Sequence, residues 1–137
     1  MKTNITTTQD QSERLLRCGV SADTADMCYD SGALSLMDYD SAVHERDSRR
    51  ETYEVIPAWS LSALLGLLPK EICDENDDSY YFSLAQEYPL NADYRAAYKY
   101  YSVDECDYVG RRSSQPIEAC VQLIEWLMEN NYKLNEQ

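Results

Sequence analysis

The sequence predicts an α+β fold in which a small antiparallel sheet with a β-hairpin is covered by two amphipathic helices, with an N-terminal helical hairpin at one end. Three patterns indicate this. Apolar residues recur at helical spacing over residues 61–68 and 117–128, and two aromatic runs, 80–88 and 94–101, alternate with the period of a strand. The 137 residues suit one domain, spanning 1–137.

The composition describes an acidic protein with enough apolar residues for a core. Apolar residues make up 44% of the chain, which separates it from disordered proteins of low hydrophobicity. The net charge of −13 opposes direct binding to nucleic acid or to an anionic membrane, because both require clustered Lys and Arg. A protein partner, and among proteins a basic one, remains the expected ligand.

Cysteine usage and the absence of long apolar segments predict a cytoplasmic protein. The five cysteines are odd in number and include no C-x-x-C pair, which argues against a disulfide framework and against a zinc site. No segment approaches the roughly 20 apolar residues that a membrane span requires, and no secretion signal is recognised.

The N-terminal region is expected to form a short helical hairpin after a flexible lead-in of residues 1–7. Thr8 followed by Gln11 is a capping-box pattern, and the helix that it opens is expected to end at Gly19. A second helix is expected over residues 22–29.

The turn at residues 18–21 also resembles that of a DNA-binding helix-turn-helix. However, Asp23 and Asp26 occupy positions where base edges and phosphates would need donors, and Arg14 and Arg17 are the only cations nearby. An ordinary helical hairpin is therefore the preferred interpretation.

Residues 31–50 have mixed charge and little periodicity, and we expect a surface loop. His44, the single histidine, lies within it. A catalytic base is conceivable, since histidine titrates near neutral pH, but no serine or cysteine stands at a recognisable motif spacing. An exposed loop histidine is preferred.

The middle of the chain predicts a strand followed by a helix. Residues 52–59 form the strand, and Pro57 confines it to the edge of a sheet or ends it early. Ser60 caps the helix over 61–68, which Pro69 ends. One stripe of this helix is expected to pack on the C-terminal helix, and it contains Leu61, Leu64, Leu65 and Leu68.

The run Asp74–Asp78 places oxygen ligands at alternate positions, as at the start of a calcium loop. Ser79 stands where that loop needs Gly, and Ala85 stands where it needs a bidentate Glu. A solvated acidic turn is therefore preferred. Between residues 71 and 107 acids far outnumber bases, which predicts that the hairpin side of the protein is the negative side.

The two aromatic runs are expected to pair as a hairpin with a five-residue loop at 89–93. The face beneath the helices would carry Tyr80, Phe82 and Leu84 from one strand and Ala96, Tyr98 and Tyr100 from the other. Tyr81, Tyr94 and Tyr101 are expected on the outer face, and residues 106–112 are expected to connect the hairpin to the last helix.

The last helix is expected from Gln115 to Asn131. Pro116 suits its first position, Glu118 favours its positive end, and Asn130 and Asn131 tolerate a left-handed stop. Its core face would consist of Ile117, Cys120, Val121, Ile124, Leu127 and Met128, opposite a polar side of Glu118, Gln122, Glu125 and Glu129.

Three segments support a family resemblance: LLRCGVSADTADMC at 15–28, AWSLSALLGLLP at 58–69, and IEACVQLIEWLMENNYKLN at 117–135. They resemble a family of short uncharacterised proteins of gut Bacteroidetes, often encoded in prophage or mobile-element regions. The resemblance implies no activity, so it identifies no catalytic, cofactor-binding or metal-binding residue.

Three functional hypotheses follow. The first is a non-enzymatic accessory protein that binds another protein through an acidic, tyrosine-rich sheet face. The second is an acidic decoy of a mobile element that imitates DNA, which would need carboxylates along a long ridge. The third is an enzyme with a carboxylate pair in a pocket, for which no phosphate loop, G-x-S-x-G, H-E-x-x-H or dinucleotide motif is present. We expect this protein to have no enzymatic activity and to bind no cofactor.

Overall fold

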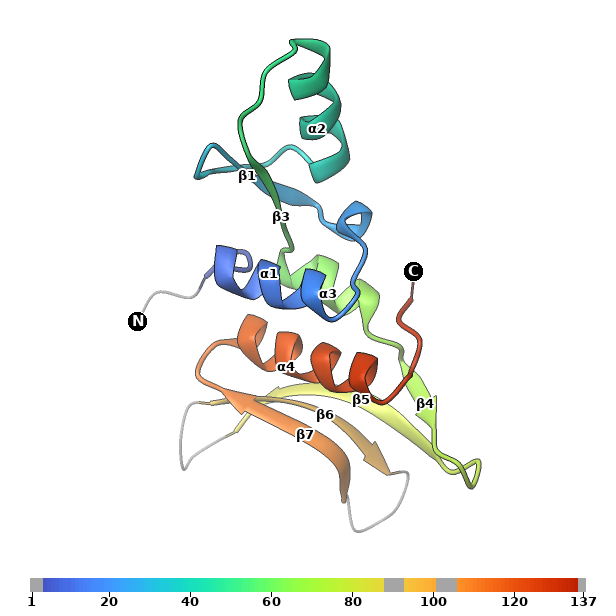
Figure 1. Ribbon diagram of the computed structural model, residues 1–137. Coiled ribbons are helices and arrows are strands. Elements are labelled where there is room, and N and C mark those ends of the chain that lie inside the picture. The colour runs from blue at the N-terminus through green and yellow to red at the C-terminus, as the bar shows by residue number, and fades with distance from the viewer. Residues whose placement is uncertain (1–3, 88–92, 101–105, 136–137) are drawn as a thin grey trace.

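The computed structural model describes residues 4–87, 93–100 and 106–135, which form an α+β fold of four α-helices and two small antiparallel sheets. The elements are arranged in layers (Figure 1). A four-stranded sheet lies at one end, helix α4 covers it, α1 and α3 lie on α4, and the second sheet with α2 lies beyond them. The predicted α+β class is thus confirmed, and the predicted arrangement of its elements is confirmed in part.

The elements have the following bounds, in chain order: α1 Gln9–Arg17, η1 (a single 3₁₀ turn) Ala22–Thr24, β1 Met27–Asp30, β2 Ala33–Ser35, α2 Tyr39–Ser48, β3 Val55–Ala58, α3 Leu61–Leu67, β4 Glu71–Cys73, β5 Ser79–Gln86, β6 Tyr94–Tyr100, β7 Asp107–Ser113 and α4 Pro116–Glu129. None of the helices within the described residues is long and apolar enough to cross a membrane.

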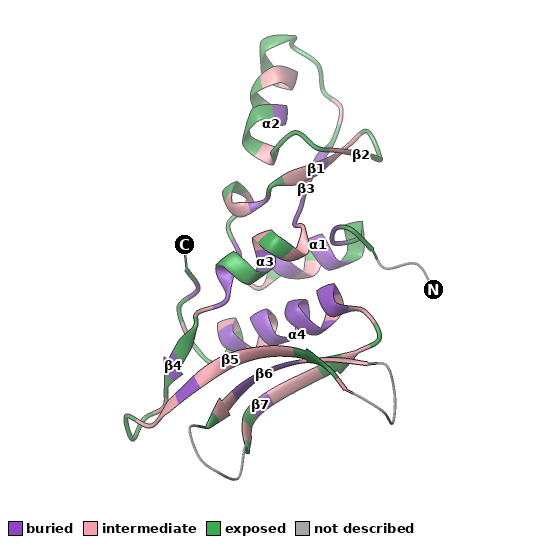
Figure 2. Cartoon of the chain, turned by 180° about the vertical axis from the view of Figure 1, so that it is seen from behind, coloured by how far each residue is buried: buried purple, intermediate pink, exposed green. Residues whose placement is uncertain are grey.

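Helix α4 is packed on two sides. One side lies on β6 and β7, and the other contacts α1 and α3 (Figures 1 and 2). Its buried residues therefore extend around more than half of its circumference and include Ala119 and Leu123 beyond the single predicted face. The prediction that the leucine helix also covers the sheet is wrong, because α3 lies on the far side of α4.

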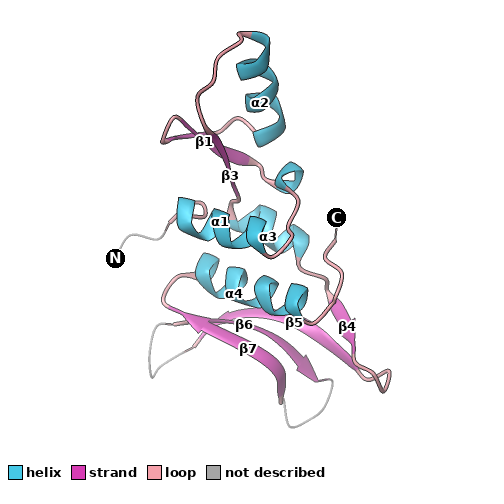
Figure 3. Ribbon diagram, viewed as in Figure 1, coloured by secondary structure: helices cyan, strands magenta, loops and turns pink. Residues whose placement is uncertain are grey.

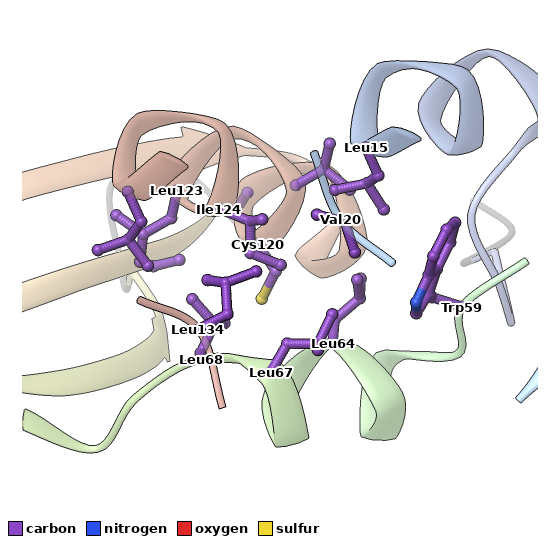
Figure 4. Close-up of a cluster of buried hydrophobic side chains, with 14 of the residues drawn as sticks. Leu15, Val20, Trp59, Leu64, Leu67, Leu68, Cys120, Leu123, Ile124 and Leu134 are labelled. Atoms are coloured by element: carbon purple, nitrogen blue, oxygen red, sulfur yellow. The ribbon is translucent and has the colours of Figure 1, made fainter. Parts of the chain in front are cut away.

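The main core forms between these layers. Figure 4 shows leucines of α3 and its C-terminal end directed toward side chains of α4, with Leu15 and Val20 from the α1 region beside them. Leu65 of the predicted stripe is 37% exposed, whereas Leu67 is 1% exposed and takes its place in the core. The other fully buried large side chains are Trp59, Leu64, Leu68, Tyr98, Ile117, Val121, Leu123, Ile124 and Leu127.

The predicted hairpin is the centre of the four-stranded sheet, whose order is β4-β5-β6-β7. Tyr80 pairs with Tyr100, and Phe82 pairs with Tyr98, so the predicted shared face is confirmed. Tyr94 lies on this same face, because it alternates in phase with Tyr98, and the prediction that it points outward is wrong. The predicted loop at 89–93 and Tyr101 lie outside or largely outside the described residues.

The predicted connection at 106–112 is instead strand β7. It pairs antiparallel with β6 from Tyr94 opposite Ser113 to Lys99 opposite Asp107, with a register shift at Tyr98 and Lys99. Its run of charges and a glycine hid the alternation, and only the pairing with β6 makes the segment a strand.

The predicted second helix at 22–29 is wrong, and β1 with its partners takes its place. After the short turn η1, Ala25 is extended, and the Asp26 carboxylate accepts hydrogen bonds from the Ser60 backbone N–H and hydroxyl. Strand β1 is then flanked on both sides, in the order β2-β1-β3. Ladder pairing with two strands outweighs the local helical tendency of this segment.

The predicted loop at 31–50 is also wrong, because it contains β2 and α2 (Figure 3). The Asp38 carboxylate caps α2 by accepting a hydrogen bond from the Ser41 N–H at 2.7 Å. Ala42 is the one buried residue of α2, and the sequence of this helix has no apolar stripe. The helix therefore could not be recognised from hydrophobic periodicity. The predicted edge strand with Pro57 is confirmed as β3.

The N-terminus is ordered from within the predicted flexible lead-in. Thr6 forms a β-bridge with Ser60, and the Thr7 hydroxyl accepts a hydrogen bond from the Trp59 N–H. The capping box of Thr8 and Gln11 is confirmed, and Gly19 follows the helix with a left-handed φ of 104°.

A charged seam joins α1 to α4. Arg14 donates to Glu118 at 2.8 Å and to Glu125 at 2.6 Å, and Gln11 donates to the same Glu118 carboxylate at 2.9 Å. The polar side of α4 is thus matched to α1. Burial alone would raise the pKa of Glu118, but hydrogen bonds from Arg14, Gln11 and Gln122 outweigh it and lower this pKa.

Leu123→Ala should lower the free energy of unfolding by about 2–5 kcal/mol, because it leaves a cavity in the middle layer. Leu65→Ala makes the same chemical change at an exposed position and should cost less than about 1 kcal/mol. Urea denaturation measures both. Equal effects of the two substitutions would contradict the burial of Leu123 in the core.

The lowered pKa of Glu118 predicts an acid-dependent contribution to stability. Since the folded-state pKa is below the unfolded value, the contribution is present above the unfolded pKa and is lost as the pH falls through the folded pKa. Glu118→Gln should therefore be less stable than the parent at pH 7 and show a smaller further loss between pH 5 and 3. Thermal unfolding across this pH range tests it, and parallel curves would refute the account of this seam.

Candidate binding cleft

A hollow of about 490 Å³ opens where the turn between β4 and β5 meets the C-terminal end of α4. We call it the acidic cleft. Its lining combines carboxylates, side-chain amides and phenol rings, contributed by Cys73, Asp74, Glu75, Asn76, Tyr108, Asn130, Asn131 and Tyr132.

One side of the acidic cleft is a ladder of aromatic rings. Tyr80 stacks on Tyr108 with ring centroids 4.1 Å apart, Tyr108 meets Trp126 edge-on at 5.8 Å, and Trp126 stacks on Tyr132 at 5.5 Å. Each contact has a geometry that aromatic quadrupoles favour. The ladder ties β5, β7, α4 and the C-terminal segment together, so it holds the phenol groups in fixed positions.

The register shift in β7 explains why Tyr108 is part of this ladder. Val109 pairs with Tyr98, and Asp107 pairs with Lys99, so Tyr108 is the additional residue of a β-bulge. The bulge lets Tyr108 and Val109 both contact residues on the helix side, where Tyr108 remains 41% exposed.

Asp74 organises the opposite side of the acidic cleft. Its carboxylate accepts hydrogen bonds from the backbone N–H groups of Asn76 at 2.9 Å and Asp78 at 3.0 Å, and from the Tyr80 hydroxyl at 2.6 Å. The Tyr80 hydrogen bond is the main cause of a lowered Asp74 pKa, and it raises the pKa of Tyr80 in turn. Asp74 is therefore ionised at neutral pH.

The end of α4 adds to the negative potential of the acidic cleft. Asn131 has a left-handed φ of 63°, as predicted for the helix stop, and the negative end of the helix dipole points toward the hollow. The hydrogen bond with Tyr108 is the main cause that raises the pKa of Tyr132 to about 12, with burial and nearby Asp74 and Glu75 adding to it. Its phenol is therefore neutral at physiological pH.

This arrangement suits a cation that carries hydrogen-bond donors. Carboxylates, phenol oxygens and amide oxygens all accept hydrogen bonds, and the rings offer surfaces that attract a guanidinium or ammonium group. The predicted alternative of a calcium loop gains no support here. The Asp74 carboxylate is occupied by internal donors, and among the described residues no three His, Cys, Asp or Glu side chains gather as a metal site.

The structure places the other candidate residues away from the acidic cleft. His44 is exposed on α2, at the opposite end of the molecule (Figure 1). The helix-turn-helix alternative lacks its second helix, and Asp26 instead binds Ser60.

The outer face of the four-stranded sheet carries charges of both signs in ion pairs. Arg95 pairs there with Glu87 and Asp107, and Arg112 also pairs with Glu87. Gly110 lies beneath Arg95, and a Cβ atom at this position would lie 2.6 Å from the guanidinium, so a larger residue would displace the arginine side chain. Within the segment predicted to be negative, five acids lie between residues 71 and 78: Glu71, Asp74, Glu75, Asp77 and Asp78.

The tyrosines that line the acidic cleft are also not those that were expected on the outer face of the sheet. Tyr108 stood in the predicted connection, and Tyr132 lies beyond the last helix. Asn131 indicated from the sequence that the chain turns after α4, because asparagine tolerates the left-handed conformation that it adopts there. The bulge that orients Tyr108 has no recognisable sequence signal.

No protein-family model, curated protein or solved structure matches this chain.

Tyr80→Phe should raise the Asp74 pKa toward the ordinary aspartate value of about 3.9, because it removes the hydrogen bond that chiefly lowers it. The contribution of Asp74 to stability is present above its unfolded pKa and is lost as the pH falls through the lowered folded pKa. A carbon-13 NMR titration of the carboxyl groups measures the change. Tyr100→Phe is the matched control and should leave Asp74 unaffected; an Asp74 pKa that does not respond to Tyr80→Phe would contradict the assigned hydrogen bond.

Proposed function

We propose that this protein is a non-enzymatic interaction module whose acidic cleft binds a basic segment of a protein partner. The observation that carries the proposal is a concave, fixed aromatic surface bordered by the Asp74 and Glu75 carboxylates at the negative end of a helix.

Charge and geometry support this function together. A net charge of −13 attracts a basic partner over distance, and the carboxylates at the β4–β5 turn direct that attraction toward the acidic cleft. Because the aromatic ladder is already assembled, binding costs little further side-chain ordering. An arginine or lysine can then lie along the exposed surface of Tyr108 and donate hydrogen bonds to the acceptors around it.

The observations favour this role over the two alternatives. An enzyme that uses a carboxylate pair needs one acid whose pKa is raised, whereas the pKa of Asp74 is lowered. A DNA-mimicking decoy needs a continuous ridge of carboxylates, whereas Glu118 and Glu125 are bound to Arg14 and Asp107 is bound to Arg95. A cytoplasmic location and kinship with the short Bacteroidetes proteins belong to the same proposal and are compatible with a binding role.

A pair of charge reversals tests the site. Glu75 lies in the acidic cleft and Glu51 follows α2 at the far end of the molecule, and both are exposed. Glu75→Lys should weaken binding of a labelled peptide of alternating arginine and glycine by about tenfold or more, corresponding to about 1.4 kcal/mol. Glu51→Lys changes the net charge equally and should alter the dissociation constant by less than about threefold. Fluorescence anisotropy at physiological salt measures both.

Equal weakening by the two reversals would mean that only total charge matters, and the acidic cleft would then not be the site. Tyr108→Leu adds a test that leaves charge unchanged. It should weaken the peptide by removing the aromatic surface, and circular dichroism shows whether the variant retains its fold.

A further inference from the structure

The second sheet has two edge strands, β2 and β3, and β2 is the more exposed of the two. Its order is β2-β1-β3, so within the described residues β2 has a strand neighbour on one side only (Figure 2). An unpaired strand presents backbone N–H and C=O groups that can pair with an added strand. Strand β2 is short, with three residues, Ala33–Ser35.

An apolar row runs from this edge across the sheet, and its inner part is covered, because the Tyr29 hydroxyl donates a hydrogen bond to the Thr7 carbonyl and α1 contacts β3. Leu34 lies directly opposite Tyr29, which lies directly opposite Ile56, so the three side chains share one face of the sheet. Helix α2 packs on the other face, where Cys28 is buried with Ala42 and Val55. The row remains incompletely buried, and Leu34 is 39% exposed.

The apolar surface continues past the end of β2. Leu36 is 78% exposed and Met37 is 40% exposed. Leu36 follows β2 immediately, at a bend in the chain, so its side chain lies close to the end of the open edge. Exposed apolar groups gathered beside an open strand edge are typical of a strand-addition site.

Carboxylates lie near both ends of β2, one on the neighbouring strand β1 and one at the start of α2. Asp30 pairs with Ala33 at the end of β2 nearest the β1–β2 turn, and Asp38 follows β2 at its other end. Hydrogen bonds from the Ser41 backbone and hydroxyl lower the pKa of Asp38, so it is ionised at neutral pH. An added strand with cations at both ends would therefore meet a negative charge at each of them.

We propose that β2 accepts an extended segment of a partner protein that has an apolar centre and Lys or Arg at both ends. Backbone pairing with β2 would supply the ladder, and alternate apolar side chains would lie beside Leu34 and Leu36. A second copy of this chain fits less well, because edge-to-edge pairing would bring two sets of Asp30 and Asp38 together. This docking surface is separate from the acidic cleft and does not depend on it.

The probe is a labelled seven-residue peptide with lysine at each end and alternating valine and threonine between them. Binding is measured by fluorescence anisotropy, and amide shifts in NMR spectra locate it. The shifts should fall on Ala33–Ser35 and Leu36 rather than on Tyr108 and Tyr132. Replacing the central residue of the peptide with proline removes a backbone donor and should weaken binding at least tenfold.

Leu36→Glu and Leu34→Glu should each weaken the peptide at least tenfold, although they add a negative charge that attracts it. Leu65→Glu is the matched control, since Leu65 is 37% exposed on α3, and it should change binding less than twofold. Leu36 is so exposed that its replacement should leave the circular dichroism spectrum unchanged.

Binding should weaken as salt is raised, because lysines and carboxylates contribute to it. The proposal is overturned if the peptide does not bind, if binding is unaffected by Leu36→Glu, or if the shifts fall on the acidic cleft. Self-association of the protein that strengthens with salt and is lost in Leu36→Glu would instead identify a second copy as the occupant.

Discussion

The burial of α4 on two sides is the constraint on which the rest of the structure depends. A helix that covers one sheet needs only one apolar stripe, but α4 also supports α1 and α3 and is therefore apolar around more than half of its surface. Its remaining polar side is matched by Arg14, which binds Glu118 and Glu125. Apolar packing and these ion pairs together fix the position of the helix between the layers.

That position produces the acidic cleft. Trp126 is near the end of α4 and links Tyr108 on the sheet to Tyr132 in the returning chain. The end of the same helix faces the turn that Asp74 organises. The cleft is therefore a product of the main core, and its aromatic groups are as fixed as the helix. The β2 edge lies on the second sheet, which has its own small core of Cys28, Ala42 and Val55.

The sequence predicted those elements whose signals are local. The helix stops at Gly19 and Asn131 and the capping box of Thr8 were readable because one residue type meets one backbone requirement. The failures, at residues 22–29, 31–50 and 106–112, are segments shaped by pairing with distant strands or by a helix with little buried surface. The acidic half of the candidate site was visible as the run at Asp74–Asp78, but its aromatic half required a bulge and a chain reversal in three dimensions.

Native-state hydrogen exchange of the backbone amides tests the central position of α4 most directly. Helices α2 and α4 differ in burial far more than in length, with one fully buried residue in α2 and eight in α4. The amides of α4 and of β6 beneath it should exchange slowest and with nearly equal free energies of opening, while those of α2 exchange much faster. Exchange of α4 amides at the rate of α2, or well before those of β6, would contradict the account of α4 as the layer that holds the fold together.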